Sequence, residues 1–364
     1  MNLAARSLLV FVAVAAILPL RASRAEDFQK TLLYGVGLRV GGGYTIRDQA
    51  PDSVGLMVLD VRPYIVGQVA PALKFQGNLD LNNADNGRIH VLDAVVRFEP
   101  HDLFNVWFGR FLPPSDRANL SGPYFQNAWN YPTIVNAYPS IYAGRTDGAA
   151  VWGEIGKGKL KYQGGIFTLD DNSPIGQAIY AGRAVFNLLD PEPGYYNSST
   201  YYGTKDVFAI GGAVQYKKTV FRPAPAVLIE QKFIAFNIDG LFEKRLGRGG
   251  DTISLEGAYY NFDQGSGAGP LPPPPSPAIK QGSSFFALAS YLIGQKLGPG
   301  RVQPMARWQR FMPSGGGGST NAIDAGLNYI VDGHATRAAL VMQHVESPGT
   351  IALTTVQLGI QIQE

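Results

Sequence analysis

The feature that most constrains this chain is a regular alternation of apolar and polar residues in segments of about ten residues. From Leu73 to Asn82 every second residue is apolar or glycine, and the residues between them are Lys, Gln, Asn or Asp. Residues 302–309 and 355–363 repeat the pattern. A period of two is typical of a β-strand with one apolar face, so the chain is predicted to be all-β. A soluble antiparallel sandwich would alternate in the same way, so alternation alone does not place the sheet in a membrane.

The number and spacing of the segments favour a membrane barrel over a sandwich. Sixteen segments can be recognised, centred near residues 38, 62, 77, 93, 108, 151, 163, 183, 212, 238, 257, 288, 306, 326, 340 and 358. The even-numbered connections are short turns with one exception at 189–206, whereas the odd-numbered ones include the long stretches 113–145, 218–231 and 264–282. Short turns at one rim and long loops at the other are expected of an outer-membrane barrel. The sequence therefore predicts a 16-stranded antiparallel transmembrane β-barrel, formed by residues 26–364 as one domain.

The composition excludes several other classes of protein. The mean hydropathy of −0.03 is too low for a bundle of membrane helices, which needs apolar runs of about 20 residues. The chain has no Cys, and its four His are not spaced as metal ligands. We therefore expect no metal site, no cofactor and no enzymatic activity. His101 and His334 fall in predicted turns, where we expect both to be solvated.

The N-terminus carries the one long apolar run, residues 8–20, which small residues at Ser23 and Ala25 follow. The run is too short to span a bilayer of about 30 Å, so residues 1–25 are predicted to be a cleaved secretory signal. Cleavage would remove three arginines and no acidic residue, which leaves 28 basic and 28 acidic residues. A neutral exported protein is not expected to bind nucleic acid. We place it in the outer membrane of a Gram-negative bacterium.

Alternation also assigns side chains to the two faces of the wall. Aromatic residues near segment ends are assigned to an outward interfacial girdle, namely Trp107, Tyr162, Tyr259, Trp308 and Tyr329. The inward faces are expected to be polar around an open aqueous lumen. Their charged residues are Arg62, Lys74, Arg97, Lys159, Lys161, Arg307 and Arg337, with Asp60, Asp80, Asp93, Glu99, Asp239, Glu256 and Asp324. Selectivity filters need rings of one sign, so this mixture predicts either weak selectivity or internal ion pairs that stiffen the wall.

Five stretches resemble the phosphate-selective porin O and P family of outer-membrane proteins. They are GRFLPPSDRANL from Gly109, RTDGAAVWG from Arg145, LKYQGGIF from Leu160, TYYGTKD from Thr200 and GLNYIVDGHATR from Gly326. The resemblance implies a 16-stranded barrel, usually trimeric, whose third extracellular loop folds into the lumen as the constriction. Family barrels usually finish on an aromatic residue, whereas this chain ends Gln363-Glu364.

The loop that corresponds to the constriction spans residues 113–145, which is 33 residues and far more than a hairpin needs. If it folds inward, the candidates for the constriction are Asp116, Arg117, Asn119, Tyr124, Asn127, Asn130, Tyr131 and Arg145. A solvated loop that caps the barrel from outside is the alternative. Phosphate-specific members of the family share a dense ladder of Arg and Lys, whereas this loop offers only Arg117 and Arg145.

The expected function is passive diffusion of small hydrophilic solutes or ions, with weak selectivity and at most a modest anion preference from Arg117 and Arg145. Two alternatives stay open: a phosphate- or anion-selective porin, and a structural or partner-holding barrel such as a sheath for an electron carrier. The expected partners are outer-membrane lipids, small hydrophilic solutes or inorganic anions, and further copies of the chain in a homotrimer. Gly35, Gly37 and Gly41 are assigned to a flat flank that would allow close contact between barrel walls.

Overall fold

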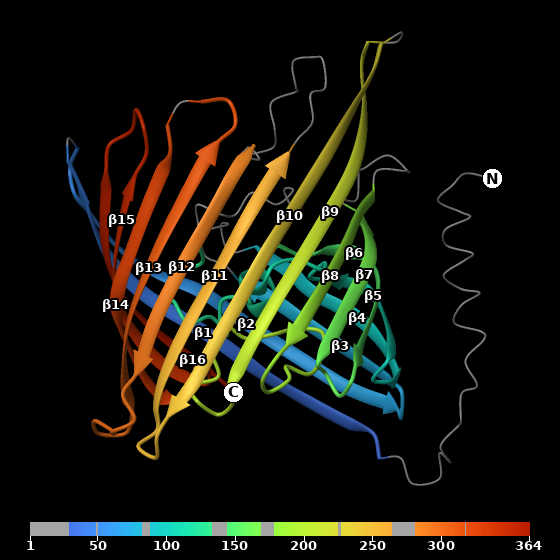
Figure 1. Ribbon diagram of the computed structural model, residues 1–364, viewed down its shortest axis with the longest axis horizontal. Helices are drawn as coiled ribbons and strands as arrows, with labels where there is room; N and C mark the ends of the chain where they lie inside the picture. Colours follow the sequence, from blue (N-terminus) through green and yellow to red (C-terminus); the bar gives the residue numbers. More distant parts are fainter. Residues whose placement is uncertain are drawn as a thin grey trace.

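The barrel closes with every strand antiparallel to its neighbours in the chain and with β1 paired to β16 (Figure 1). The computed structural model describes residues 29–48, 50–81, 88–132, 144–168, 178–224, 227–263, 281–316 and 318–364. The predicted signal, residues 1–25, lies outside the described residues.

All sixteen predicted segment centres lie in strands, so the predicted barrel is confirmed. The strands are β1 (Thr31–Arg47), β2 (Ser53–Ala70), β3 (Leu73–Leu81), β4 (Ile89–His101), β5 (Phe104–Phe111), β6 (Thr146–Ile155), β7 (Leu160–Thr168), β8 (Ala178–Asn187), β9 (Val207–Ala224), β10 (Val227–Leu246), β11 (Asp251–Asp263), β12 (Gly282–Leu292), β13 (Arg301–Pro313), β14 (Thr320–Asp332), β15 (Thr336–Glu346) and β16 (Leu353–Gln363). The described helix α2 covers only Arg117–Ser121. Among the described residues, no helix has the length and apolar character needed to cross a membrane.

Burial alternates along the strands, because one face of the wall points into the barrel and the other points away. In β11, Ser254 and Glu256 are buried, whereas the intervening Leu255 is exposed. The exposed positions of the other strands also carry large apolar side chains, such as Trp308 and Ile323. An apolar outer face and a largely polar inner face are the arrangement of a wall that lipid surrounds.

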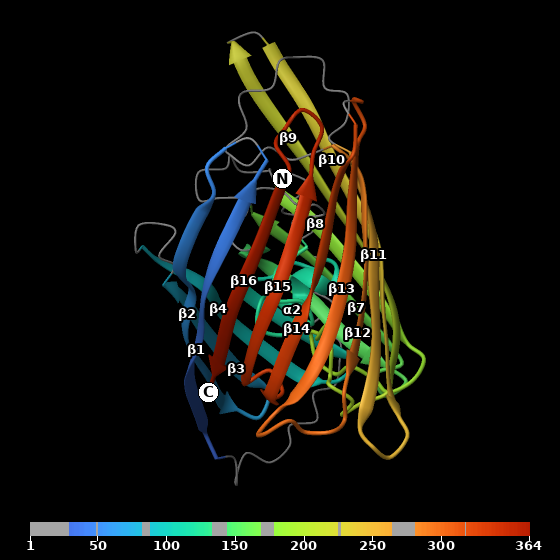
Figure 2. The same ribbon diagram turned by 90° about the vertical axis from the view of Figure 1, so that its left-hand side faces the viewer.

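The two rims of the barrel differ as predicted, with one correction. We call the rim where β1 begins and β16 ends the terminal rim, and the opposite one the loop rim. Residues 218–231 were expected to be a long loop, but β9 and β10 pair almost throughout and leave only 225–226 between them. The prediction was wrong because Val220, Phe221 and Ile229 are residue types that favour strands, so the pairing continues through this stretch. The paired strands rise beyond their neighbours (Figure 2).

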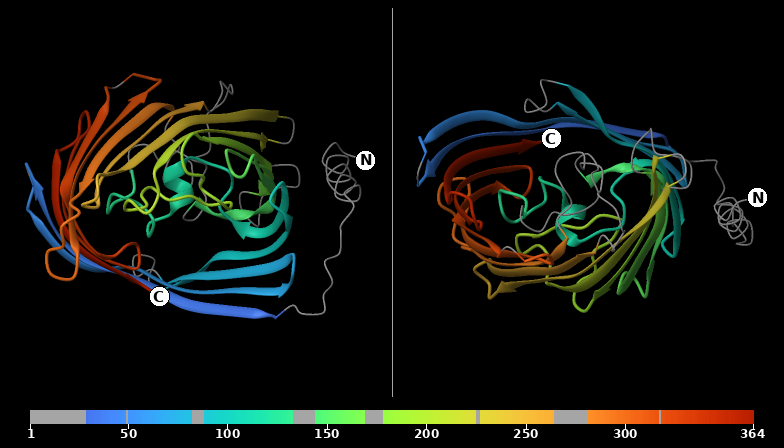
Figure 3. Two further views of the ribbon diagram at one scale, coloured as in Figure 1. Left: turned by 60° about the horizontal axis from the view of Figure 1, so that its bottom comes forward. Right: turned by 90° about the horizontal axis from the view of Figure 1, so that it is seen from above.

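The interior of the barrel is not an open lumen. Residues 112–132 of the β5–β6 connection, which include α2, contact inward-facing side chains of the wall. Residues 188–206, the β8–β9 connection at the terminal rim, also lie within the ring of strands (Figure 3). We call these two segments together the septum. This second segment was expected only as a longer connection among the short turns of that rim.

Two apolar clusters on the inward faces correct the expectation of a polar interior. Phe286 and Leu288 pack with Ala118 of the septum, and Trp107 packs with Leu120 and other apolar residues. The outward assignment of Trp107 was therefore wrong. The reason is that this indole is covered by the septum, which a strand pattern does not reveal.

Gly35, Gly37 and Gly41 of β1 lie on the inward face of the wall. Gly37 is buried, and a Cβ at this position would lie 2.7 Å from the ring of Tyr124, a septum residue. Gly35 and Gly41 share the inward parity of Gly37 and Arg39, because side chains alternate along a strand. The expectation that these glycines form an outward contact face was wrong.

Candidate functional site

The first segment of the septum is attached to the wall through its backbone carbonyl groups. Arg39 donates from Nη2 to the Trp129 oxygen over 2.6 Å, and Arg337 donates from Nη1 to the Gln126 oxygen over 2.6 Å. Further wall donors are Arg307 to Asn130 (2.9 Å), Asn328 to Asn127 (3.0 Å) and Gln361 to Tyr124 (3.0 Å). Hydrogen bonds from charged donors are the stronger kind, so the arginines fix the position of the loop.

Two aromatic side chains of this segment fill spaces that glycines leave in the wall. Tyr124 lies over Gly37, and Trp129 lies over Gly359, where a Cβ would overlap the indole. The Arg39 guanidinium is 4.2 Å from the Trp129 ring centroid, which is a cation–π distance. Close packing and charge therefore reinforce the same placement of residues 123–131.

Arg117 joins the two segments of the septum to each other. Its guanidinium donates to both carboxylate oxygens of Glu192, over 2.7 and 2.5 Å, and to the Ser198 oxygen over 2.7 Å. Both side chains of the ion pair are only 1% exposed. Burial would lower the pKa of Arg117 and raise that of Glu192, but each partner outweighs this effect, so the pKa of Arg117 is raised and that of Glu192 is lowered. The pair is therefore charged, and Arg117 is not a free pore cation.

Most other residues predicted for the constriction lie within the septum. Asp116 caps α2 by accepting from the Asn119 amide over 3.3 Å, and Tyr260 of β11 donates to it over 2.6 Å. Tyr131 donates to the Asn119 side chain over 3.1 Å. Asn127 is fully buried against Ser290 (2.8 Å), and Asn130 contributes the carbonyl group described above. Tyr124 and Arg145 of the predicted set line the cavity of 260 Å³ described below.

The second segment of the septum is held by the wall from several sides. Lys161 donates to three of its carbonyl groups, at Glu192, Gly194 and Tyr196, over 3.0 to 3.3 Å. Glu256 accepts from Ser199 over 2.7 and 2.8 Å. Glu243 accepts from Thr200 (2.6 Å) and from the amides of Tyr201 (2.9 Å) and Gly203 (3.0 Å). Lys161, Arg307 and Arg337 were predicted to line the pore, and the structure places all three against the septum. The inward assignment of Lys159 was wrong, because this residue is exposed in the β6–β7 turn and donates to the Leu189 oxygen over 2.6 Å.

His334, in the β14–β15 turn, is packed rather than solvated as the sequence suggested. Its Nε2 lies 2.9 Å from the Thr200 oxygen and 3.3 Å from Ser198 Oγ, and its ring lies between the rings of Phe125 and Tyr202. Burial, helped by the charge of Arg337, lowers the pKa of His334 to about 4. The imidazole is therefore neutral near neutral pH.

Between the septum and the inner face of β1–β3 lies a cavity of 260 Å³, which we call the eyelet cavity. Its polar wall residues include Arg62, Tyr64, Gln76 and Asn78, and Arg145 faces it from the end of the β5–β6 connection. Arg62 pairs with Asp60 (2.6 Å) and Asp80 (3.4 Å), and Arg145 pairs with Asp93 (2.9 Å).

A second cavity of 610 Å³, the vestibule cavity, lies toward the terminal rim. Lys74, Arg97 and Glu99 line it from the wall, and Tyr195 and Tyr196 line it from the septum. Glu99 accepts from Lys74 (2.7 Å), from Arg97 (2.9 Å) and from the Trp107 indole (2.8 Å). Arg97 also donates over 3.2 Å to Gln76, which lines the eyelet cavity, so the two cavities follow one another along β3.

In the ion pairs that line these cavities, the cation is more exposed than its carboxylate. The exposed fraction of the side chain is 33% for Lys74 and 20% for Arg97, against 9% for Glu99. Arg145 is 10% exposed and its partner Asp93 1%. The carboxylates therefore lie toward the wall and the positive groups toward the cavities.

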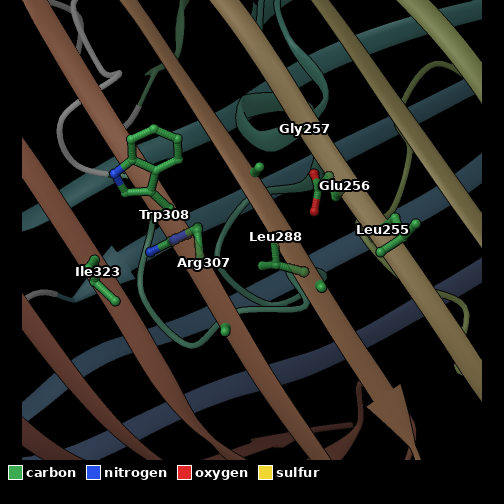
Figure 4. Close-up of a pocket in the computed structure, with 10 residues that line it drawn as sticks. Leu255, Glu256, Gly257, Leu288, Arg307, Trp308 and Ile323 are labelled. Atoms are coloured by element: carbon green, nitrogen blue, oxygen red, sulfur yellow. The ribbon is translucent and has the colours of Figure 1, made fainter.

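The outside of the barrel carries a separate hollow of 510 Å³ across β11–β14. It forms because Gly257, Ala287, Ala289 and Ala306 are small, and Leu255, Trp308 and Ile323 border it. Figure 4 also labels Glu256, which follows Leu255 in β11, and Arg307, which precedes Trp308 in β13. The side chains of Glu256 and Arg307 are buried in the barrel, whereas Leu255 and Trp308 are exposed. The hollow is thus an apolar feature of the outer wall and is not part of the path through the lumen.

The chain shares its architecture with solved outer-membrane proteins. An anion-selective porin from Comamonas acidovorans matches with a TM-score of 0.61 at 11% identity, over 92% of this chain and 100% of the other. The outer-membrane channel DcaP of Acinetobacter baumannii gives 0.58 at 11% identity, over 94% and 99%. A trimer form of OmpT, an outer-membrane protein of Vibrio cholerae, gives 0.58 at 10% identity, over 93% and 100%.

The chain has a porin-type fold. No protein-family model matches the sequence, and no curated protein matches it either. Identities of 10 to 11% support the fold and nothing finer. The resemblance to the phosphate-selective family therefore stays a prediction.

Sequence reasoning missed Glu192, Glu243 and the aromatic residues of 188–206. One signal was available, because 189–206 was the only long connection among the short even-numbered ones. Length alone does not show whether such a connection enters the barrel or stays outside it.

Proposed function

We propose that this protein is a passive diffusion channel of a Gram-negative outer membrane, and not an enzyme. The observation that carries the proposal is the pair of consecutive cavities between the septum and the inner wall, inside a closed barrel whose outer face is apolar. Small hydrophilic solutes would enter at the loop rim, pass the eyelet cavity beside Tyr124 and Arg145, and leave through the vestibule cavity. The β5–β6 loop would then be the constriction.

Planar-bilayer recording tests the channel directly. Purified protein should produce stable stepwise conductance that is ohmic at low voltage. Reconstituted, correctly folded protein that never conducts would overturn the proposal. A barrel that encloses a protein cargo is less well supported, because cavities of 260 and 610 Å³ are far too small for a folded chain.

The proposed selectivity is a modest preference for small anions. It is supported by the orientation of the ion pairs, in which Lys74, Arg97 and Arg145 lie closer to the cavities than their carboxylates. Lys74 and Arg97 share the single carboxylate of Glu99, but Asp102 and Glu154 also line the vestibule cavity, so the preference should be small. Arg117, which pairs with Glu192 within the septum, should contribute little to it.

Reversal potentials in a KCl gradient test this assignment. The double variant Lys74→Gln/Arg97→Gln should lose most of the chloride preference, whereas Lys296→Gln, which removes an exposed cation in the β12–β13 turn, should not. Equal reversal potentials for all three proteins would contradict the assignment. Block of the chloride current by micromolar phosphate would instead support the phosphate-selective alternative.

We also propose a homotrimer surrounded by outer-membrane lipid, in line with the trimer form of one protein that has a similar structure. Cross-linking in mild detergent should yield species up to three chains. Detection of single chains alone would count against the trimer.

A further inference from the structure

The β8–β9 connection differs from an ordinary turn in where its polar groups lie. It starts and ends at the terminal rim, yet Glu192, Ser199 and Thr200 are almost completely buried inside the barrel. Each of these side chains has a hydrogen-bond partner, and the partners come from β10, β11 and the opposite loop. Burying polar groups costs free energy unless they are paired, so this set of partners fixes one position of the segment.

The contacts between the two segments of the septum are as specific as those to the wall. The Arg117–Glu192 ion pair is bidentate. Asn197 donates to the Arg117 oxygen (3.1 Å) and to Ser121 Oγ (3.3 Å), and the Ser199 amide donates to the Phe125 oxygen over 3.0 Å. A loop from one rim and a connection from the other therefore meet inside the barrel and support each other.

The second segment also borders the proposed path. Pro193, Gly194, Tyr195 and Tyr196 line the vestibule cavity, and the Tyr195 ring stacks on Trp107 with centroids 4.5 Å apart. The first segment borders the eyelet cavity through residues 121–125. Each segment thus bounds one of the two consecutive cavities.

We infer that residues 188–206 are a second constriction element, and that Glu192 is a positioning residue that holds this element and the constriction loop together. The inference rests on the proposed channel function. The segment from the loop rim and the segment from the terminal rim then determine the width of the path together. A substitution at Glu192 changes this width without removing any group that lines the two cavities.

Single-channel recording of two variants tests the inference. Glu192→Gln removes the carboxylate that neutralises the buried guanidinium of Arg117, and Asn197→Ala removes bonds between the two segments without touching the wall. Both channels should show more open-state noise and admit larger neutral polymers than the native protein. Conductance should rise by roughly 1.5- to 2-fold for Glu192→Gln, as expected if a wider lumen carries more water, and by less for Asn197→Ala.

Glu346→Gln is the matched control, because it makes the same substitution at an exposed carboxylate on the loop rim. It should behave as the native protein does. If all variants conduct with native conductance, noise and polymer cut-off, the second constriction is overturned while the channel function stands. If the native protein itself forms no channel, the proposed function fails instead. Asn197→Ala keeps the test decisive even if Glu192→Gln does not fold.

Discussion

Single residues fix how the septum meets the wall. A glycine at 359 makes room for Trp129, and no other residue type leaves that space. Arg39 then covers the indole while it donates to the backbone of the same residue. Local geometry of this kind depends on very few atoms, so it responds sharply to substitution.

Gly359→Leu should displace the Trp129 ring and destabilise the folded barrel by roughly 1 to 3 kcal/mol, the usual range for overpacking. Urea unfolding in detergent micelles, followed by tryptophan fluorescence, measures the change. Gly164→Ala is the control, because a Cβ there would meet nothing within 4 Å. Equal stability of both variants would mean that Trp129 does not occupy this position.

His334 should make stability depend on pH. Its pKa is lowered from 6.5 to about 4, so between these values the unfolded chain binds more protons than the folded one. The contribution of the neutral imidazole is complete above pH 6.5 and is lost as the pH falls through 4, by roughly 1 to 3 kcal/mol. Arg337 opposes protonation, and the Thr200 oxygen accepts the Nε2 proton.

Thermal unfolding between pH 7.5 and 4 measures this effect. The native protein should lose stability over this interval more steeply than His334→Gln. Parallel pH profiles for the two proteins would show that the imidazole does not titrate at the septum.

At the scale of elements, a strand and a septum segment differ in how many other strands they are bonded to. Each strand pairs only with its two neighbours, so a change in one hairpin stays local. The septum segments are instead bonded to many strands at once, from β1 to β16. Shortening a hairpin and shortening a septum segment should therefore have different consequences.

Replacing residues 219–231 with a two-residue turn should leave the barrel intact. These residues pair only between β9 and β10, beyond the height of the neighbouring strands. Heat-modifiable migration on gels and single-channel conductance should both match the native protein. A large loss of either would mean that the extension supports the rest of the wall.

The strands could be predicted from the sequence because a period of two encodes which face of a segment is apolar. Alternation does not reveal the septum, whose first segment is indicated only by its length and by the family resemblance, because the wall binds this segment mainly through backbone carbonyl groups, which every residue type carries. Trp107 shows the same limit. Alternation tells which residues of a strand share a face, but it does not tell which face the septum covers. Glu192 stood in a connection of unusual length, which was the one signal available.

The whole molecule combines a wide barrel with a narrow interior. Sixteen strands leave room for an aqueous channel, but the septum takes up much of this space. Permeability should therefore be limited by the two cavities and not by the strand number.

Liposome swelling should fall steeply with solute size, with compounds of amino-acid size entering readily and trisaccharides nearly excluded. The same preparation should show a β-dominated circular dichroism spectrum. Entry of trisaccharides at a rate close to that of small solutes would mean that the septum does not obstruct the barrel.

The hydrogen bonds that hold residues 123–131 allow the constriction loop to change its sequence during evolution. Arg39, Arg307 and Arg337 donate hydrogen bonds to main-chain carbonyl oxygens, which are present whatever side chain a position carries. A substitution at Gln126 or Asn130 therefore leaves these main-chain hydrogen bonds in place. A barrel built in this way can acquire new permeants by altering a handful of loop residues, while the framework that positions them stays as it is.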